Sequence, residues 1–331
     1  MRGGCFSIGL LLFSSAVMMR PCPAQNLQTI RVSCLPAVPL PITVAQMHGT
    51  FAKYGITVQA KVAPNSSELR EDIADGRADI AHSAVDNDVA LVEAGAADVV
   101  IVMGGEGSTN EVMAQPEVHS ISALRGQLLI VDAPDTAYAL QLKKILLSNG
   151  LAAGKDYQLK AVGSTPMRLK AMRDHKEYAA SILGAPTSIL AKQDGFVSLG
   201  TTQNLIGPYQ AIGAYVQRKW ARENSTTLER YMAAYVEAQR WLLDPGNRQP
   251  VIALIMDQWN LGQSLAVEAY NSIIGPGGYQ RDAELDIPAF INVLKIRAEV
   301  VGQWGGQVPK PEKYYDPAYY HAAISLLKEG R

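Results

Sequence analysis

The chain has few cysteines and none of the common catalytic motifs. Only three of its 331 residues are cysteine. No HExxH, GxSxG, GxxxxGK[ST] or CxxC pattern occurs, which argues against the usual zinc protease, serine hydrolase, P-loop and dithiol sites. The Gly-rich residues 104–107 lack the spacing and the following helix of a dinucleotide-binding loop. We therefore predict that the protein is not an enzyme and uses no cofactor and no metal.

An excess of charge of either sign is also missing. Lys and Arg number 30 against 31 Asp and Glu, so the formal net charge is −1. A nearly neutral chain is a poor ligand for nucleic acid or for an anionic membrane, and neither is expected as a partner. The composition, 48% hydrophobic and 18% charged, is that of an ordinary globular protein, and the length suggests two domains.

Residues 1–24 have the pattern of a secretory signal peptide. Arg2 precedes an uncharged apolar run over residues 5–19, and small residues lead up to Ala24. The run is too short to span a bilayer easily. The residues before Cys22 do not suit a lipoprotein signal, so no lipid anchor is expected there. We predict cleavage after Ala24, export to the periplasm and no direct insertion into the membrane.

Cleavage leaves a mature chain with a single cysteine, Cys34, so no intramolecular disulfide can form. A chain of this size buries enough surface to fold without a disulfide bond. Cys34 lies near the end of a predicted strand, and we expect a small core residue rather than a reactive thiol. The four tryptophans, Trp220, Trp241, Trp259 and Trp304, fall in the helical last third and are expected to pack in the core.

Strands and helices alternate through most of the mature chain. In the first third we expect strands over residues 29–35, 56–61, 78–81 and 99–103. Helices are expected between them, over residues 42–54, 66–75 and 89–93. After Pro116 the pattern restarts, with strands over residues 127–131, 157–161, 179–182, 197–200 and 211–217. Short connections between strands and helices favour parallel sheets.

Two runs of alternating elements indicate two lobes. The last third, beyond residue 217, is almost entirely helical. We expect the chain to cross to a second lobe near residues 112–118 and to return near 205–212. Lobe 1 then comprises residues 25–112 and 210–331, and lobe 2 comprises residues 113–209. Two crossing strands form a hinge, and a cleft lies between the lobes.

Four segments carry a resemblance to a known family. They are the helix running into Tyr54-Gly55-Ile56, the GRADIA stretch at residues 76–81, the LRGQ turn at residues 124–127, and the late Tyr315-Asp316-Pro317. In this order they resemble the substrate-binding proteins of ABC importers for nitrate, sulfonate, taurine and thiamine pyrimidines. The resemblance implies an α/β, two-lobed periplasmic binding protein of type II, with a mixed sheet flanked by helices in each lobe. It also implies a monomer that delivers a small solute to a membrane permease.

The resemblance places the ligand at five segments, namely residues 37–41, 83–87, 108–110, 132–136 and 184–188. The candidate ligand-binding residues are Pro39, Pro41, Ser83, Asp86, Asn87, Thr109, Asn110, Asp132, Asp135, Thr136, Pro186 and Thr187. None of these segments contains Lys or Arg. A strongly anionic ligand is therefore not favoured, and a neutral, zwitterionic or mildly basic heterocycle or amine fits at least as well.

Other roles remain open for several of these residues. Asp86, Asp132 and Asp135 precede predicted helices, and an N-cap is the simpler expectation for each. Ser83 and Thr187 fit a cap or a ligand contact equally well. His82 lies beside Asp86 and has the side chain of a base, but no partner nucleophile is evident, so a solvated loop position is favoured.

Two other functions stay open. One is an enzyme on the same fold, similar to the pyrimidine-forming synthase of thiamine biosynthesis, although that protein is cytosolic and has a cysteine cluster. The other is a ligand-sensing lobe that reports to a membrane receptor without transport, which sequence alone does not separate from an importer subunit.

Overall fold

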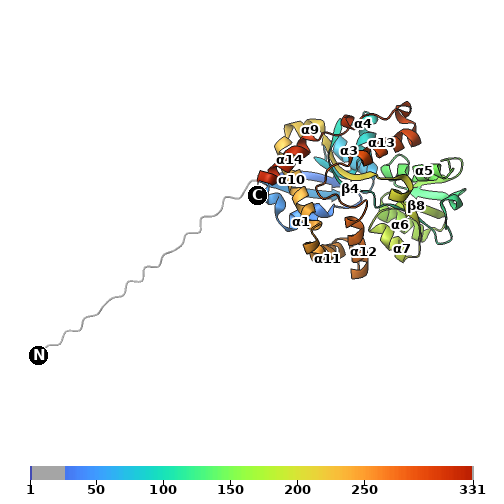
Figure 1. Ribbon diagram of the computed structural model, residues 1–331, viewed down its shortest axis with the longest axis horizontal. Coiled ribbons are helices and arrows are strands. Elements are labelled where there is room, and N and C mark those ends of the chain that lie inside the picture. The colour runs from blue at the N-terminus through green and yellow to red at the C-terminus, as the bar shows by residue number, and fades with distance from the viewer. Residues whose placement is uncertain (2–26, 330–331) are drawn as a thin grey trace.

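The computed structural model describes Met1 and residues 27–329. The predicted signal peptide lies, apart from Met1, outside the described residues. Figure 1 shows two lobes side by side, one containing α1, α10 and α14 and the other containing α5, α6 and α7 around β8. Each lobe is built on a five-stranded sheet flanked by helices, which confirms the predicted α/β fold class.

The sheet of lobe 1 has the strand order β2-β1-β3-β10-β4. Its strands are β1 (Gln28–Cys34), β2 (Ile56–Val62), β3 (Ile80–Ala84), β4 (Val99–Gly107) and β10 (Gln210–Gln217). Strands β2, β1 and β3 are parallel, whereas β10 runs antiparallel to both β3 and β4. The returning strand β10 therefore lies inside this sheet and makes it mixed.

The sheet of lobe 2 repeats this design with the order β7-β6-β8-β5-β9. Its strands are β5 (Glu111–Ala114), β6 (Leu128–Val131), β7 (Gln158–Ala161), β8 (Tyr178–Leu183) and β9 (Val197–Thr201). Here β5, the strand that enters the lobe, is the antiparallel member, paired with β8 and β9. Sheet membership does not by itself fix the limits of the lobes, which remain a prediction.

The helices cover the faces of both sheets. Before β4 the chain forms α1 (Leu40–Met47), α2 (Thr50–Lys53), α3 (Ser66–Ala74) and α4 (Asp86–Glu93). Between β5 and β10 it forms α5 (Ala137–Ser148), α6 (Thr165–Asp174), α7 (Thr187–Gln193) and α8 (Thr202–Ile206). After β10 follow α9 (Arg218–Glu223), α10 (Ser225–Leu242), α11 (Arg248–Trp259), α12 (Gln263–Ile274), α13 (Ile287–Val301) and α14 (Ala318–Glu329). No helix among the described residues is long and apolar enough to cross a membrane.

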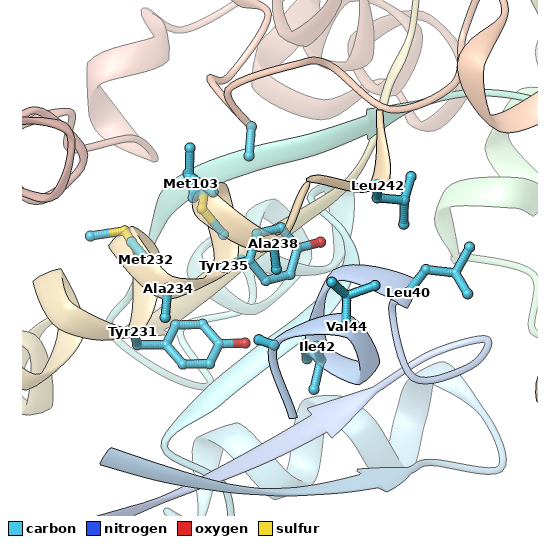
Figure 2. Close-up of a cluster of buried hydrophobic side chains, with 14 of the residues drawn as sticks. Leu40, Ile42, Val44, Met103, Tyr231, Met232, Ala234, Tyr235, Ala238 and Leu242 are labelled. Atoms are coloured by element: carbon cyan, nitrogen blue, oxygen red, sulfur yellow. The ribbon is translucent and has the colours of Figure 1, made fainter. Parts of the chain in front are cut away.

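The core of lobe 1 lies where α10 packs on α1. Apolar residues recur on one face of α10, where Tyr231 and Tyr235 are buried one turn apart. Figure 2 shows them beside Ile42 and Val44 of α1. Burying an aliphatic side chain of this size stabilises a fold by about 1.5–3 kcal/mol. The long helix α10 thus holds α1 over the first sheet.

Several predicted elements have other bounds in the structure; for example, the strand expected over residues 99–103 extends to Gly107, and the helix expected over residues 89–93 begins at Asp86. The helix expected over residues 42–54 is two helices, α1 and α2, because Gly49 between them adopts a left-handed conformation with φ 65°. The strand expected over residues 78–81 is shifted and extends from Ile80 to Ala84. Each of its five residues is buried, because β3 lies in the middle of the sheet between β1 and β10.

Candidate functional site

A cleft of about 360 Å³ lies between the lobes. Lobe 1 lines it with the loop after β1, with Glu106 near the end of β4, and with Trp259 at the end of α11. Lobe 2 contributes the loop after β8 and the first turn of α6. The larger part of its surface is apolar, and the carboxyl ends of strands from both sheets point at it, as is usual for ligand sites in α/β proteins.

A small cavity of about 30 Å³ adjoins the cleft and shares part of its wall, including Tyr138 and Ile212. Its own polar lining comes from Asn87, Asp132 and Arg168. This volume holds a water molecule or one small polar group of a ligand. The cavity therefore extends the cleft toward Asp132 and Arg168 of lobe 2.

Most of the predicted ligand residues lie at these two cavities. The larger cleft is lined by Pro39, Thr109, Asn110, Pro186 and Thr187. The small cavity is lined by Asn87, Asp132 and Thr136. The four that line neither are Pro41, Ser83, Asp86 and Asp135.

Asp86 is engaged in a buried ion pair. Arg297 of α13 donates from Nε to Oδ1 at 2.7 Å and from Nη2 to Oδ2 at 2.6 Å. Both side chains are almost fully buried, at 6% and 1% exposure. The expected N-cap role is also wrong, because α4 begins at Asp86 and its N-cap is Val85. Asp86 therefore joins β3 and α4 to the C-terminal part of the chain.

The other three residues have structural surroundings as well. Ser83 belongs to β3, and its hydroxyl lies 2.9 Å from the hydroxyl of Tyr215. Pro41 is buried in the first turn of α1, where a missing N–H costs nothing. Asp135 is 66% exposed and faces Arg70 at 3.4 Å. The N-cap of α5 is Thr136, so the capping role expected for Asp132 and Asp135 is wrong.

Asp132 connects the two lobes. It follows β6 in lobe 2, and its Oδ2 accepts a hydrogen bond from the backbone N–H of Ser66 at 3.2 Å. Ser66 opens α3 in lobe 1, where the first N–H groups of the helix lack partners within the helix. The other oxygen, Oδ1, is buried and has no partner among the described residues. This carboxylate therefore bridges the lobes and has one acceptor left.

Arg168 is a site residue that the loop-based prediction missed. It lies in α6 and is 1% exposed. Nε donates to the hydroxyl of Ser181 at 3.0 Å, and Nη2 donates to the carbonyl of Ile182 at 3.0 Å. Burial lowers the pKa of Arg168 to about 10, while the negative charge of Asp132 opposes this change. A cation on the buried face of a helix is the signal that could have drawn attention to it.

The aromatic and acidic lining of the cleft was also missed. Trp259 packs against the core of lobe 1, as expected, and it also lines the cleft together with Tyr138 and Tyr279. Glu106 lies beside them, and burial raises its pKa to about 7. In the sequence, Glu106 lies between two glycines. This Gly-rich stretch indicated only that no dinucleotide-binding loop is present.

His82 does not reach the cleft. It is buried in β3, its Nε2 lies 2.8 Å from the hydroxyl of Tyr231, and its ring stacks on Tyr235. Burial lowers the pKa of His82 to about 3, so the imidazole is neutral. The expectation of a solvated loop histidine is wrong. Burial also raises the pKa of Cys34 to about 12, which agrees with a core thiol.

Two similarly built sheets, a cleft between them and two crossing segments define a periplasmic binding protein fold. The chain belongs to the NMT1-like family, whose model matches residues 25–256. No curated protein matches it.

Solved structures with the same fold have low sequence identity to this chain. A Bordetella bronchiseptica RB50 protein is 19% identical with a TM-score of 0.78, covering 92% of this chain and 98% of its own. The nitrate-binding protein of Synechocystis PCC 6803 is 13% identical with a TM-score of 0.74, covering 92% and 90%. The alkanesulfonate-binding protein of Xanthomonas axonopodis pv. citri, bound to MOPS, is 17% identical with a TM-score of 0.68, covering 86% and 95%. At these identities the likeness shows the fold.

Proposed function

We propose that this protein is the extracytoplasmic solute-binding subunit of an ABC importer and that it captures a small organic solute in the cleft. The observation that carries the proposal is the cleft itself, since both lobes line it and its volume of about 360 Å³ suits a small molecule. Among the structures with the same fold, the Synechocystis protein is named a periplasmic nitrate-binding protein, and a Staphylococcus aureus protein is named the ligand-binding component of an ABC-type import system. We also propose that the predicted signal peptide directs export of this protein to the periplasm.

The proposed mechanism is hinge closure. The chain passes between the lobes over residues 108–110 and 207–209, and these two segments serve as the hinge. A solute held by both lobes binds the closed form more tightly than the open form and shifts the equilibrium toward closure. The bond from Ser66 to Asp132 crosses the cleft and forms only when the lobes are close.

The proposed ligand-binding residues are the eight predicted residues that line the cavities, joined by Glu106, Tyr138, Trp259 and Tyr279. Asp86 and Ser83 are left out because their side chains are occupied within lobe 1. The proposed lobe limits are residues 25–112 with 210–331 for lobe 1 and residues 113–209 for lobe 2.

The closed protein is proposed to act as a monomer and to deliver its solute to a membrane permease. Neither histidine nor cysteine is among the described residues that line the two cavities. The one histidine considered as a base, His82, is buried behind the cleft wall.

The proposal is tested by thermal melting of the mature protein against sulfonates, nitrate, pyrimidines, amines, amino acids and aromatic acids. A ligand that binds only the native state stabilises it by about 2.7 kcal/mol at a hundredfold excess over the dissociation constant. We expect one class to raise the melting temperature and to be recovered unchanged. Recovery of a chemically altered compound contradicts a binding protein and supports the enzyme.

Closure is tested by small-angle X-ray scattering with and without the stabilising solute. We expect a smaller radius of gyration in its presence. In the Asp132→Ala variant we expect roughly tenfold weaker binding, because the closed form loses one charge-assisted hydrogen bond. Unchanged scattering on binding contradicts hinge closure.

A further inference from the structure

Glu106 is a carboxylate in the cleft without a counter-ion. Its backbone is fixed, since Gln210 donates from Nε2 to its carbonyl at 3.1 Å and Tyr279 forms a β-bridge with it. Its carboxylate has no ion pair and no hydrogen bond among the described residues, and burial is the one cause that raises its pKa to about 7. Glu106 is half-buried in the wall of the cleft, and a partly desolvated carboxylate without a partner favours a ligand that compensates its charge.

Three tyrosines from three elements lie near Glu106, namely Tyr138 of α5, Tyr235 of α10 and Tyr279 in the segment between α12 and α13. Burial raises the pKa of each phenol, and the negative charge of Glu106 raises it further. Tyr138 and Tyr279 line the cleft with it. Aromatic faces attract cations, and a carboxylate beside them strengthens the attraction. These groups make this end of the cleft a place for positive charge.

The arginine that lines the larger cleft is already paired, because the Nε of Arg173 donates to Oδ2 of Asp194 at 2.7 Å. Arg168 lines the small cavity instead, where it donates to Ser181 and to backbone carbonyls and the charge of Asp132 lies near it. Among the described residues that line the larger cleft, Glu106 is therefore the charged group without a partner.

We infer that the solute is an organic cation, an amine whose N–H groups donate to Glu106 while its apolar body lies against Val38, Leu190 and Trp259. These three residues belong to the apolar wall of the same cleft. The inference rests on the proposed function and narrows the open choice of neutral, zwitterionic or basic solutes to one class.

The test uses solutes sorted by charge, so that the ligand need not be known beforehand. The small molecules of yeast extract are separated by ion exchange at pH 7 into cationic, neutral and anionic fractions, and each is added to the mature protein in a melting experiment. We expect the cationic fraction to raise the melting temperature. A shift by the neutral or anionic fraction alone overturns the inference and leaves the proposed function standing, and a shift by none overturns both.

A matched pair of variants assigns the effect to Glu106. Glu106→Gln removes the charge and keeps the shape, and Glu117→Gln makes the same change at an exposed position outside the cleft. We expect the amine isolated from the cationic fraction to bind Glu106→Gln roughly thirtyfold more weakly and to bind Glu117→Gln as it binds the parent. Equal affinity for the parent and Glu106→Gln overturns the inference.

A pH series gives a second readout. Amines stay protonated below pH 9, so a change of affinity between pH 8 and pH 6 reports the carboxylate. As the pH falls through the pKa of Glu106, about 7, the carboxylate is neutralised and we expect the affinity to fall. Glu106→Gln is expected to lose this dependence, and a dependence that persists in the variant overturns the inference.

Discussion

The two lobes each bury an arginine, and they do so in opposite ways. In lobe 1, Arg297 is paired with Asp86 by two side-chain hydrogen bonds, and Asp86 raises its pKa above the usual range. In lobe 2, Arg168 donates to a hydroxyl and to backbone carbonyls, and its pKa is lowered to about 10. One guanidinium is neutralised inside the fold, and the other lines a cavity.

A related difference separates two segments that occupy corresponding places in the two sheets. A polar segment follows the third strand of the parallel set in each lobe, after β3 and after β8. In lobe 1, Arg297 of α13 forms an ion pair with the carboxylate of Asp86 in this segment. In lobe 2 no such residue covers the segment, and Pro186 and Thr187 line the cleft. The polar segment of lobe 1 therefore has a structural role because α13, which follows β10 in the chain, supplies its partner Arg297.

The largest effect is expected from breaking the pair in lobe 1. Arg297→Leu leaves the buried carboxylate of Asp86 uncompensated, and we expect a loss of about 3–5 kcal/mol in the free energy of unfolding, measured in urea. Asp86→Ala is expected to destabilise similarly. The double variant Arg297→Leu with Asp86→Leu serves as the control and is expected to recover part of the loss. Stability within 1 kcal/mol of the parent in Arg297→Leu contradicts a structural pair.

A second effect on stability depends on pH and is expected from lobe 1 alone. The middle of β3 carries the titratable His82, whereas the middle of β8 carries Ser181. The unfolded chain binds a proton at His82 below pH 6.5, whereas the folded one does so only near pH 3. Stability from this group is therefore complete above pH 6.5 and falls by about 1.4 kcal/mol per pH unit below it. At pH 5 we expect about 2 kcal/mol less stability for this reason.

Urea unfolding at pH 7 and pH 5 measures this loss. His82→Gln is expected to lose less stability between the two pH values than the parent, while the exposed His119→Gln variant behaves like the parent. Equal pH dependence in all three proteins shows that His82 is not the group responsible.

A smaller effect is expected at the arginine of lobe 2. Arg168→Met removes the donors to Ser181 and to two carbonyls without leaving a directly paired carboxylate. We expect a loss of about 1–3 kcal/mol, again from urea unfolding, because unsatisfied acceptors cost less than an unpaired buried charge. If Arg168→Met loses as much free energy of unfolding as Arg297→Leu, the two arginines do not differ in how they stabilise their lobes.

The smallest effect is expected at Asp135. This residue is 66% exposed and its partner Arg70 lies at 3.4 Å, so Asp135→Asn should change stability by less than about 0.5 kcal/mol. Urea unfolding and the affinity for the stabilising solute are measured together. A loss of affinity places Asp135 in the site after all.

The fold was largely predictable from sequence, because the alternation of strands and helices reports local patterns. The shift of β3 was not, because residues 82–84 are polar or small and their burial depends on β10, which arrives about 130 residues later, as in the pairing of Gly213 with Ser83. The sequence also did not show that Gly49 divides the first helix.

Eight of the twelve predicted ligand residues line the cavities, because strand ends gather at one edge of a sheet. Arg168, Trp259 and Glu106 were missed, since their exposure to the cleft depends on how the lobes pack. The role of Asp86 was missed because its partner Arg297 lies 211 residues away in the chain.

The position of β10 between β3 and β4 also constrains the order of folding. The sheet of lobe 2 uses strands from one continuous stretch, Glu111 to Thr201, and can form as soon as that stretch is available. The sheet of lobe 1 lacks its fourth strand until residues 210–217 arrive, so β3 and β4 must wait with unpaired edges. Pairing distant segments is slow because loop closure costs entropy before contacts form. The N-terminal lobe, although made first, is therefore the last to be completed, which keeps the chain incompletely folded until most of it has been synthesised.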